Sequence, residues 1–357
     1  MLFRIIKRSK ITVKKNIMIR ISSIVFALLL VAIFIALLGL NPMGVYSSML
    51  KGAFGSAYSI RETIIKAIPL AITALGISVA FKMQFWNIGG EGQIIMGAFL
   101  SSYFALRFPE LNSFLLLSIM ALAGIIGGAI WAYIPAILKC KYGTNETIVT
   151  LMMNYIALKF ITYLQYGPWK DPNAQGFPKI SNFSENAILP DVFGINIGWI
   201  ITIVLIIFMY IFMNYTKKGY EIAVLGESEK TALYAGINIK STIVISMLLS
   251  GGLCGLAGMI QASAVSNTLS VQVSGGIGYT AIIVAWLSNL SSPLILMVSI
   301  LFAALLEGGS FIQTAFGIPE SVASIIQASI LFFVLGSEFF IKYKLVKNNT
   351  STLKEVA

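Results

Sequence analysis

The sequence predicts an all-α, polytopic membrane protein with about ten transmembrane helices. Apolar residues make up 57% of the 357 residues and charged residues only 11%, whereas soluble domains average about 25% charged. The mean hydropathy is +0.88. Several apolar runs reach the roughly 20 residues that span a bilayer as a helix. The polar connections between them are too short to form a sizeable soluble domain.

The spans follow from the apolar runs in order. Residues 1–20 are basic without an acidic residue, and the apolar run 21–40 follows them directly. This run ends without an A-x-A-like cleavage site, which favours a retained first helix over a signal peptide. An amphipathic stretch follows at 46–58. The other expected spans are 62–82, 93–106, 113–138, 147–166, 197–215, 241–263, 278–289, 293–313 and 322–342. Residues 21–342 are therefore expected to form a single transmembrane domain, followed by a basic tail, 343–357.

The distribution of basic residues predicts the orientation. Ten spans place both termini on one side, and most of the 25 lysines and arginines fall on that side. Because basic residues concentrate in cytoplasmic segments, both termini and the polar loop 216–240 are expected in the cytoplasm. The loop 167–196, which contains four prolines, is then external. The basic residues expected on the external side are Lys51, Arg61, Arg107, Lys170 and Lys179.

The segment 86–93 interrupts two apolar runs and is the main candidate for a solute pathway. Three glycines within four residues disfavour a regular helix there, and broken backbone at membrane depth is tolerated only where protein buries it or where it lines a water-filled cavity. The polar and aromatic candidates for the pathway in this segment are Trp86, Asn87, Glu91 and Gln93. A second interpretation is a helix start, with Asn87 as the cap and Glu91 offsetting the helix dipole.

Three further polar positions fall at or inside apolar spans. Asn145 and Glu146 fit the cap and first turn of the next helix. Asn154 lies two turns deeper and either joins helices or contacts a solute. Glu307 lies past the middle of the ninth span, where an unpaired carboxylate is costly, so a partner such as Lys66 or Lys159 is expected. Asn154 and Glu307 complete the set of pathway candidates.

The cytoplasmic loop 216–240 favours docking to a partner over a merely solvated charge run. Its inner part is compatible with a short helix closed by glycine, which suits insertion into a partner's groove. The spacing of Gly236, Lys240 and Ser241 superficially matches a phosphate loop but lacks the glycine before the lysine and a preceding strand. Any ATP-driven function therefore needs another subunit. The coupling candidates are Gly219, Glu221, Gly226, Leu233, Tyr234 and Gly236.

Residue types narrow the function classes. The chain has no histidine, which excludes histidine-dependent triads and histidine-ligated metal or haem sites. Cys140 and Cys254 are far apart and form neither a metal pair nor a disulfide framework. An intramembrane enzyme lacks paired aspartates or a Ser-Lys arrangement, and a structural scaffold does not explain the carboxylates inside apolar spans. Among these function classes, the polar residues that interrupt the apolar spans favour transport.

Three segments resemble one family of membrane permeases. Residues 85–93 (FWNIGGEGQ) look like the FNIGxEGQ signature of ABC-importer permeases for branched-chain amino acids, ribose and nucleosides. Residues 145–156 (NETIVTLMMNYI) and 219–237 (GYEIAVLGESEKTALYAGI) are similar to two further motifs of that family, in the same order. The chain departs from the patterns at Trp86, which is an extra residue, at Ala223 and at Ser228-Glu229. The chain looks most like the larger permease subunit of nucleoside and simple-sugar uptake systems.

The resemblance implies a transport subunit without its own ATPase site, in the cell membrane of a prokaryote. Its implied partners are an ABC ATP-binding subunit, a second permease subunit and an extracytoplasmic substrate-binding lipoprotein, with no cofactor bound by this chain. The expected solute is a nucleoside; the alternatives are a ribose-like sugar or a branched-chain amino acid. Two different permease subunits are expected to form the pathway together as a heterodimer, and a homodimer of this chain is the alternative. A different mechanism stays open, namely an ion-coupled carrier that uses Glu91 or Glu307 as a proton relay.

Overall fold

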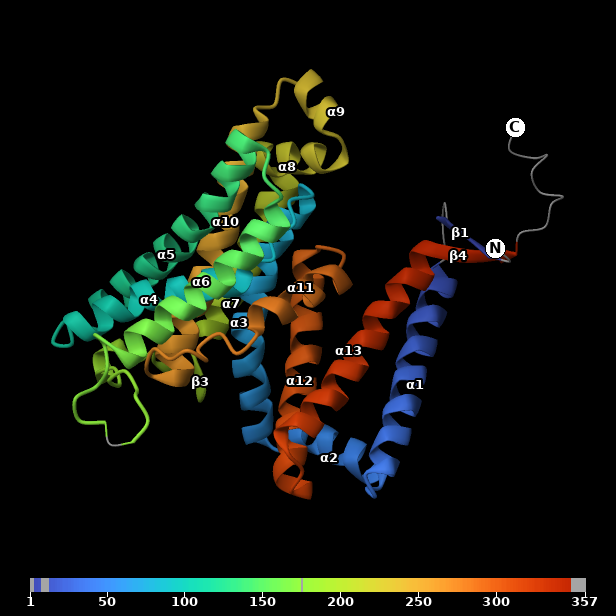
Figure 1. Cartoon of the computed structure of the whole chain (residues 1–357), viewed down its shortest axis with the longest axis horizontal. Coiled ribbons are helices and arrows are strands. Elements are labelled where there is room, and N and C mark those ends of the chain that lie inside the picture. Colours follow the sequence, from blue (N-terminus) through green and yellow to red (C-terminus); the bar gives the residue numbers. More distant parts are fainter. Residues whose placement is uncertain (1–2, 8–12, 175, 348–357) are drawn as a thin grey trace. The chain divides into compact units, whose positions relative to one another are not determined.

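The computed structural model describes residues 3–7, 13–174 and 176–347, and it is mostly helical (Figure 1). Every apolar run predicted as a span forms a helix. The only strands among the described residues form two small antiparallel pairs, β1 (Phe3–Lys7) with β4 (Tyr343–Lys347) and β2 (Asp191–Val192) with β3 (Ile195–Asn196). The helices that correspond to the predicted spans are α1 (Val13–Leu37), α3 (Ala57–Lys82), α4 (Gly90–Arg107), α5 (Ser113–Tyr142), α6 (Glu146–Tyr166), α7 (Gly198–Tyr215), α10 (Ile239–Ile260), α11 (Ile277–Leu287), α12 (Ser292–Phe316) and α13 (Glu320–Lys342).

The described residues contain six helices long and apolar enough to cross a membrane, which makes the chain an all-α, polytopic membrane protein. A seventh is added if the end of α1 and α2 (Pro42–Phe54), which meet at a bend of 113°, form one broken span. Helix α11 has 11 residues and is about 16 Å long at 1.5 Å per residue, too short to cross the roughly 30 Å hydrocarbon core alone. The predicted count of ten stays a prediction.

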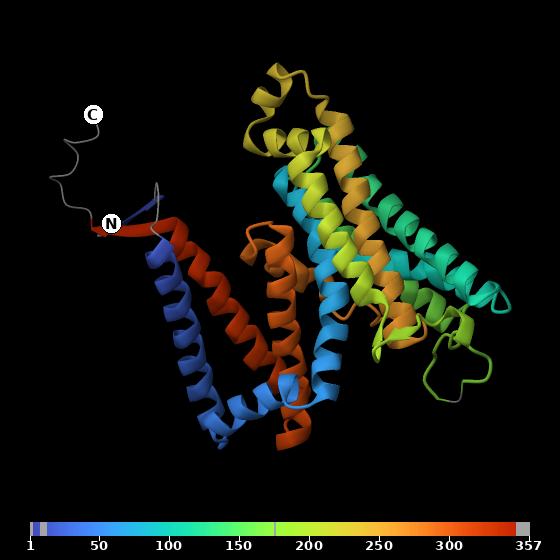
Figure 2. The same cartoon turned by 180° about the vertical axis from the view of Figure 1, so that it is seen from behind.

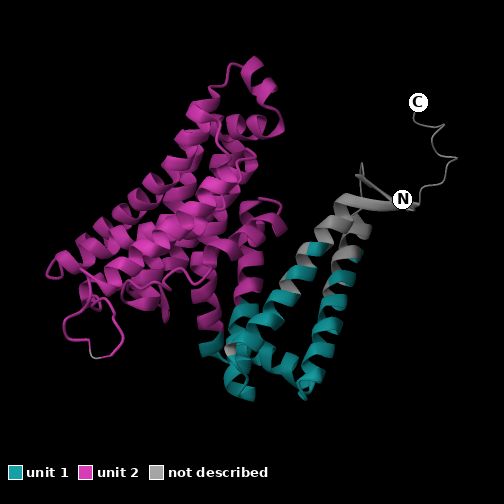
Figure 3. Ribbon diagram, viewed as in Figure 1, with its two compact units in different colours: residues 1–59, 304–357 teal, residues 60–303 magenta. Residues whose placement is uncertain are grey.

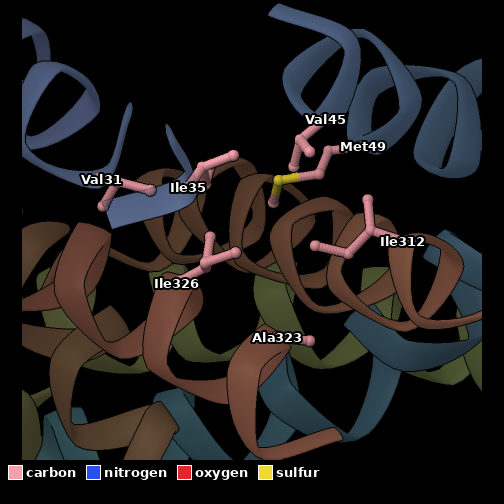
Figure 4. Packing of buried hydrophobic residues seen from close by; sticks show 7 residues of the cluster. All are labelled: Val31, Ile35, Val45, Met49, Ile312, Ala323 and Ile326. Carbon is pink, nitrogen blue, oxygen red and sulfur yellow. The ribbon is translucent and has the colours of Figure 1, made fainter. Parts of the chain in front are cut away.

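The chain divides into two compact units, and the boundaries fall in the first turn of α3 and within α12 (Figure 3). Unit 1 comprises residues 1–59 and 304–357. Its core is an apolar cluster contributed by α1, α2, α12 and α13 (Figure 4). The amphipathic stretch predicted before the second span is α2, whose buried side faces this cluster. Asn41 caps α2 by accepting hydrogen bonds from the amides of Met43 and Gly44. The cluster consists of Val31, Ile35, Val45, Met49, Ile312, Ala323 and Ile326.

Unit 2 comprises residues 60–303 and contains the predicted motifs. Helix α3 is buried along most of its length. Helices α4, α5 and α10 pack closely because glycines line their contacts: a Cβ on Gly255 of α10 would collide with the carbonyl oxygen of Gly124 and lie 2.9 Å from Cα of Gly128, both in α5. Small residues at such spacing let helices approach closely. The α10 helix continues into a π-helical turn, Gln261–Ser266.

The loop 216–240 folds into two short helices, α8 (Lys217–Glu227) and α9 (Glu229–Tyr234). Both views of the chain show them together at one end of α7 and α10 (Figures 1 and 2). The loop 167–196 lies toward the other end of α7 and contains a 3-10 turn, Glu185–Ala187, and the β2–β3 hairpin. The two loops that were predicted on opposite faces of the membrane thus lie at opposite ends of α7.

Candidate functional site

The irregular segment between α3 and α4 is 83–89, so only the first half of the break predicted at 86–93 is irregular, and residues 90–93 form the first turn of α4. Helix α3 ends in a turn in which Gln84 adopts a left-handed conformation with φ of 58°. The amide of Phe85 donates to the carbonyl oxygen of Ala80 over 3.0 Å, which is the bonding that closes helix ends of this type. The side-chain amide of Gln84 donates to the carbonyl oxygen of Gly226 over 2.6 Å. The start of the broken segment is therefore tied to the end of α8.

Asn87 and Gln93 form a buried amide pair across the break. Nδ2 of Asn87 lies 3.2 Å from Oε1 of Gln93, and Nε2 of Gln93 lies 3.1 Å from Oδ1 of Asn87. Asn87 also accepts from the amide of Gly89 and donates to Oγ of Ser250 on α10. Asn87 is not the N-cap of α4, which is Gly89, so the predicted capping role is wrong in detail. Its hydrogen bonds instead fix the loop that leads into the helix.

Glu91 lies in the first turn of α4, as predicted, and its carboxylate also caps a second helix. Oε1 accepts from the amide of Gly276 over 2.9 Å and Oε2 from the amide of Gly278 over 2.7 Å. Both amides belong to the N-terminus of α11, where backbone N–H groups lack helical partners and favour a negative charge. A Cβ on Gly278 would lie 2.6 Å from Cα of Glu91. Glycine there lets the two helix starts approach closely.

Asn154 joins α6 to the broken segment and to the start of α4, which agrees with the first of its two predicted roles, the joining of helices. Its Oδ1 accepts from the amide of Gly92 over 2.8 Å, and its Nδ2 donates to the carbonyl oxygen of Ile88 over 2.9 Å. One turn earlier, Oγ1 of Thr150 accepts from the amide of Ile88 over 3.2 Å. Asn154, Asn87, Glu91 and Gln93 are thus buried and bonded to the protein itself. A role of these four in contacting solute stays a prediction.

Three aromatic rings gather at the end of α3. Trp86 stacks on Trp286 of α11 with ring centroids 5.5 Å apart and planes 24° apart. Phe81 of α3 lies 5.5 Å from Trp86 and 5.8 Å from Trp286 at steeper angles. Phe81 is buried, whereas 45% of Trp86 is exposed. Sequence reasoning identified Trp86 and missed Trp286, because the long stretch of chain between them carries no periodic signal that would pair them.

The remaining predicted positions lie apart from this cluster. Asn145 caps α6 by accepting from the amides of Thr147 and Ile148, as predicted. Glu146 forms an ion pair of 2.8 Å with Lys139 at the end of α5. Glu307 belongs to unit 1 and is half-buried. Its pairing with Lys66 or Lys159 stays a prediction. Within the described residues, no group of three acidic or cysteine side chains could hold a metal ion.

Helix α8 is fixed to the body of unit 2 by the predicted residues. A Cβ on Gly219 would collide with the carbonyl oxygen of Phe212, and one on Gly226 would collide with that of Lys82. Glu221 forms an ion pair of 2.6 Å with Lys218 and also accepts from Oγ1 of Thr242. The hydrogen bond from Lys218, helped by its positive charge, lowers the pKa of Glu221.

Helix α9 presents an apolar tip outward. Ser228 caps its start through the amide of Thr231, and Gly236 closes its end with φ of 72°. Between these caps, Leu233 and Tyr234 are 62% and 94% exposed. Beside it, a cavity of about 360 Å³ lies between α8, the start of α9, the turn 83–85 and the Lys139–Glu146 pair. Helix α9 and this cavity together form a surface suited to a partner.

Residues 59–335 match the family model of the branched-chain amino acid transport system permease component. This match covers most of the chain. The chain belongs to this permease family. It is 33% identical to the nucleoside ABC transporter permease protein NupB of Lactococcus lactis, over 96% of this chain and 98% of that protein. It is 30% identical to the glucose ABC transporter permease protein TsgB13 of Haloferax volcanii, over 87% and 85%, and 28% identical to the guanosine ABC transporter permease protein NupP of Bacillus subtilis, over 90% and 94%.

Family membership and the apolar helices make this permease a multi-pass membrane protein and a transport subunit of an ABC importer. The resemblance drawn from the three sequence motifs is confirmed. The motifs correspond to the structural features described above: the segment between α3 and α4, the start of α6, and the pair α8 and α9.

Proposed function

We propose that this permease carries a nucleoside into a prokaryotic cell, driven by a separate ATP-binding subunit. Two of the relatives above are named for nucleoside or guanosine transport, and one of these matches the chain along nearly its full length. In this proposal the chain crosses the membrane ten times, with both termini and residues 216–240 in the cytoplasm. A second permease subunit completes the pathway, and an external binding lipoprotein delivers the solute.

The observation that carries the proposal is the link between the outward-facing helix α9 and the broken segment. Leu233 and Tyr234 offer an apolar anchor of the kind that inserts into a groove. Helix α8, which precedes α9, is bonded to Gln84 at the start of segment 83–89. A displacement of α9 by the ATPase would therefore be transmitted through α8 to the segment that carries Trp86. The amide pair and the Glu91 cap keep the rest of that segment in shape as it moves.

The proposal is tested by uptake into vesicles that contain the complete importer. Uptake of a radiolabelled nucleoside should require both ATP and the ATPase subunit, and it should continue when the proton gradient is collapsed. Uptake driven by a proton gradient without the ATPase subunit would instead establish an ion-coupled carrier, for which Glu91 and Glu307 are the relay candidates. Reporter fusions within residues 216–240 test the orientation independently, because an external location would remove the docking role.

A sugar is the second candidate solute, because the Haloferax relative is named for glucose. The two classes differ in one chemical feature, the planar base. Competition of a labelled nucleoside by excess unlabelled base-free ribose or glucose separates them. A nucleoside importer should take up the labelled nucleoside equally well in the presence of either sugar, whereas a sugar importer should take up labelled glucose or ribose and not the nucleoside.

A further inference from the structure

Trp86, which stacks on Trp286, has an exposed aromatic surface and lies on irregular backbone. Lipid cannot face irregular backbone within the hydrocarbon region, because its polar groups need partners or water. Gln84 and Trp86 are the exposed residues of the segment 83–89, and Gln84 is polar. The surface that they present therefore faces water or protein. Among the candidate pathway residues of unit 2, Trp86 has the largest exposed fraction, since the other four are buried.

The geometry of the cluster suits a flat ligand. Centroids 5.5 Å apart and a small interplanar angle describe an offset stack, and Phe81 supports both rings from inside. Trp86 is thus held against Trp286 while 45% of it stays exposed. A heteroaromatic ring can continue such a stack, and stacking on aromatic side chains tolerates any base because every base has a π-face.

We propose that Trp86, backed by Trp286, is a stacking station for the nucleobase on the solute pathway. The planar base packs on the exposed part of Trp86, and the ribose is left to other groups. This inference rests on the proposed nucleoside function and deepens it by naming the residue pair that distinguishes an aromatic base from a non-aromatic one. Because Gln84 links the same turn to α8, the station lies on the segment that the ATPase is proposed to move.

The test compares uridine with dihydrouridine, which has the same sugar and a similar set of hydrogen-bonding groups but a saturated, puckered base. The measured quantity is the ratio of their KM values for uptake by the complete importer. A change in this ratio between variants reports on the permease, since the binding lipoprotein is the same throughout. The wild type should prefer uridine, and W86L should lower that preference by about tenfold, a typical cost of losing one stacked ring. W86F should keep most of it, and W286L should reduce it.

The chain offers a matched control in Trp169, which stacks on Phe99 with centroids 5.3 Å apart and planes 30° apart, in the external loop. W169L should leave the ratio at the wild-type value. An unchanged ratio in W86L would overturn the stacking station while leaving nucleoside transport intact, and Trp86 would then be an interfacial anchor. A wild type that takes up no nucleoside would overturn the proposed function and the station with it.

A second measurement needs no substitution. Irradiation of the wild-type importer with 5-iodouridine should attach the base to Trp86 or Trp286, as mapped by mass spectrometry of the permease. Excess uridine should suppress the attachment, and excess ribose should not. Attachment only at other residues would overturn the station even if W86L failed to fold.

Discussion

Replacement of Glu91 tests whether its main role is to join two helix starts. Its carboxylate accepts two backbone amides of α11 at 2.9 and 2.7 Å and is buried. A hydrogen bond to a charged group contributes about 1.5–3 kcal/mol. The carboxamide introduced by E91Q would keep one acceptor and place an NH₂ against the other amide, so the expected loss is about 2 kcal/mol. In E91A both amides are left without a partner, and the expected loss is about 4 kcal/mol.

The assay is thermal unfolding of the purified permease. After heating to each temperature, the fraction that remains folded is measured by size-exclusion chromatography, which gives the unfolding midpoint. One kcal/mol corresponds to roughly 2–4 °C for a large domain, so E91Q should lose several degrees and E91A about twice as much. E110Q, which alters an exposed glutamate in the turn between α4 and α5, should behave as the wild type. If E91A keeps the wild-type midpoint while uptake is lost, the capping argument is refuted and Glu91 acts on the solute.

The docking helices and the glycine contacts lead to three more expected outcomes. The double variant L233D/Y234D should abolish co-purification of the ATPase subunit and leave the permease folded. F177D, which alters an aromatic as exposed as Tyr234 in the loop predicted to be external, should leave co-purification intact. Lys218 lowers the pKa of Glu221 below the ordinary value of 4.5, so the ion pair stabilises the fold fully above pH 4.5 and loses this effect as the pH falls further. E221Q should weaken the dependence of the unfolding midpoint on pH, measured between pH 3 and 7. G255A should cost about 2 kcal/mol or more, because its Cβ meets the α5 backbone, and it should lower the same unfolding midpoint.

The helices could be predicted from sequence because hydropathy and length decide them locally. Each apolar run became a helix, and the start of α6 was predicted from its cap, Asn145. The number of crossings could not be predicted in the same way. Helix α11 is apolar but too short to span alone, and its start is defined by a carboxylate from α4. The hydropathy of a sequence window depends only on the residues within it, so it cannot show that a carboxylate from another helix caps the start of α11.

The candidate site shows the same limit. A break at 86–93 was predicted from its glycines; the irregular segment is 83–89, and Gly90 and Gly92 lie in α4. Trp86 and Asn87 lie in the irregular segment, and Glu91 and Gln93 lie in the first turn of α4. The sequence could not show that the two amides of this set pair with each other, since either could equally face a solute. Nor could it show Trp286, whose role depends on a contact with a distant part of the chain. Side chains that act through long-range contacts carry no local pattern.

The buried polar groups and the exposed ring of the broken segment have different roles: the polar groups fix the backbone, and the ring is exposed at the surface. Asn87 and Gln93 use their amide groups on each other, and Glu91 uses both carboxylate oxygens on α11. Satisfied groups of this kind hold a backbone in one shape, because breaking any of the bonds leaves a buried donor or acceptor unpaired. In the proposed mechanism, the pull of α8 on Gln84 acts on a segment that these bonds hold in one shape. In the same proposal, selection among solutes depends on the side chain that this segment presents outward, and in the segment 83–89 the exposed aromatic side chain is Trp86.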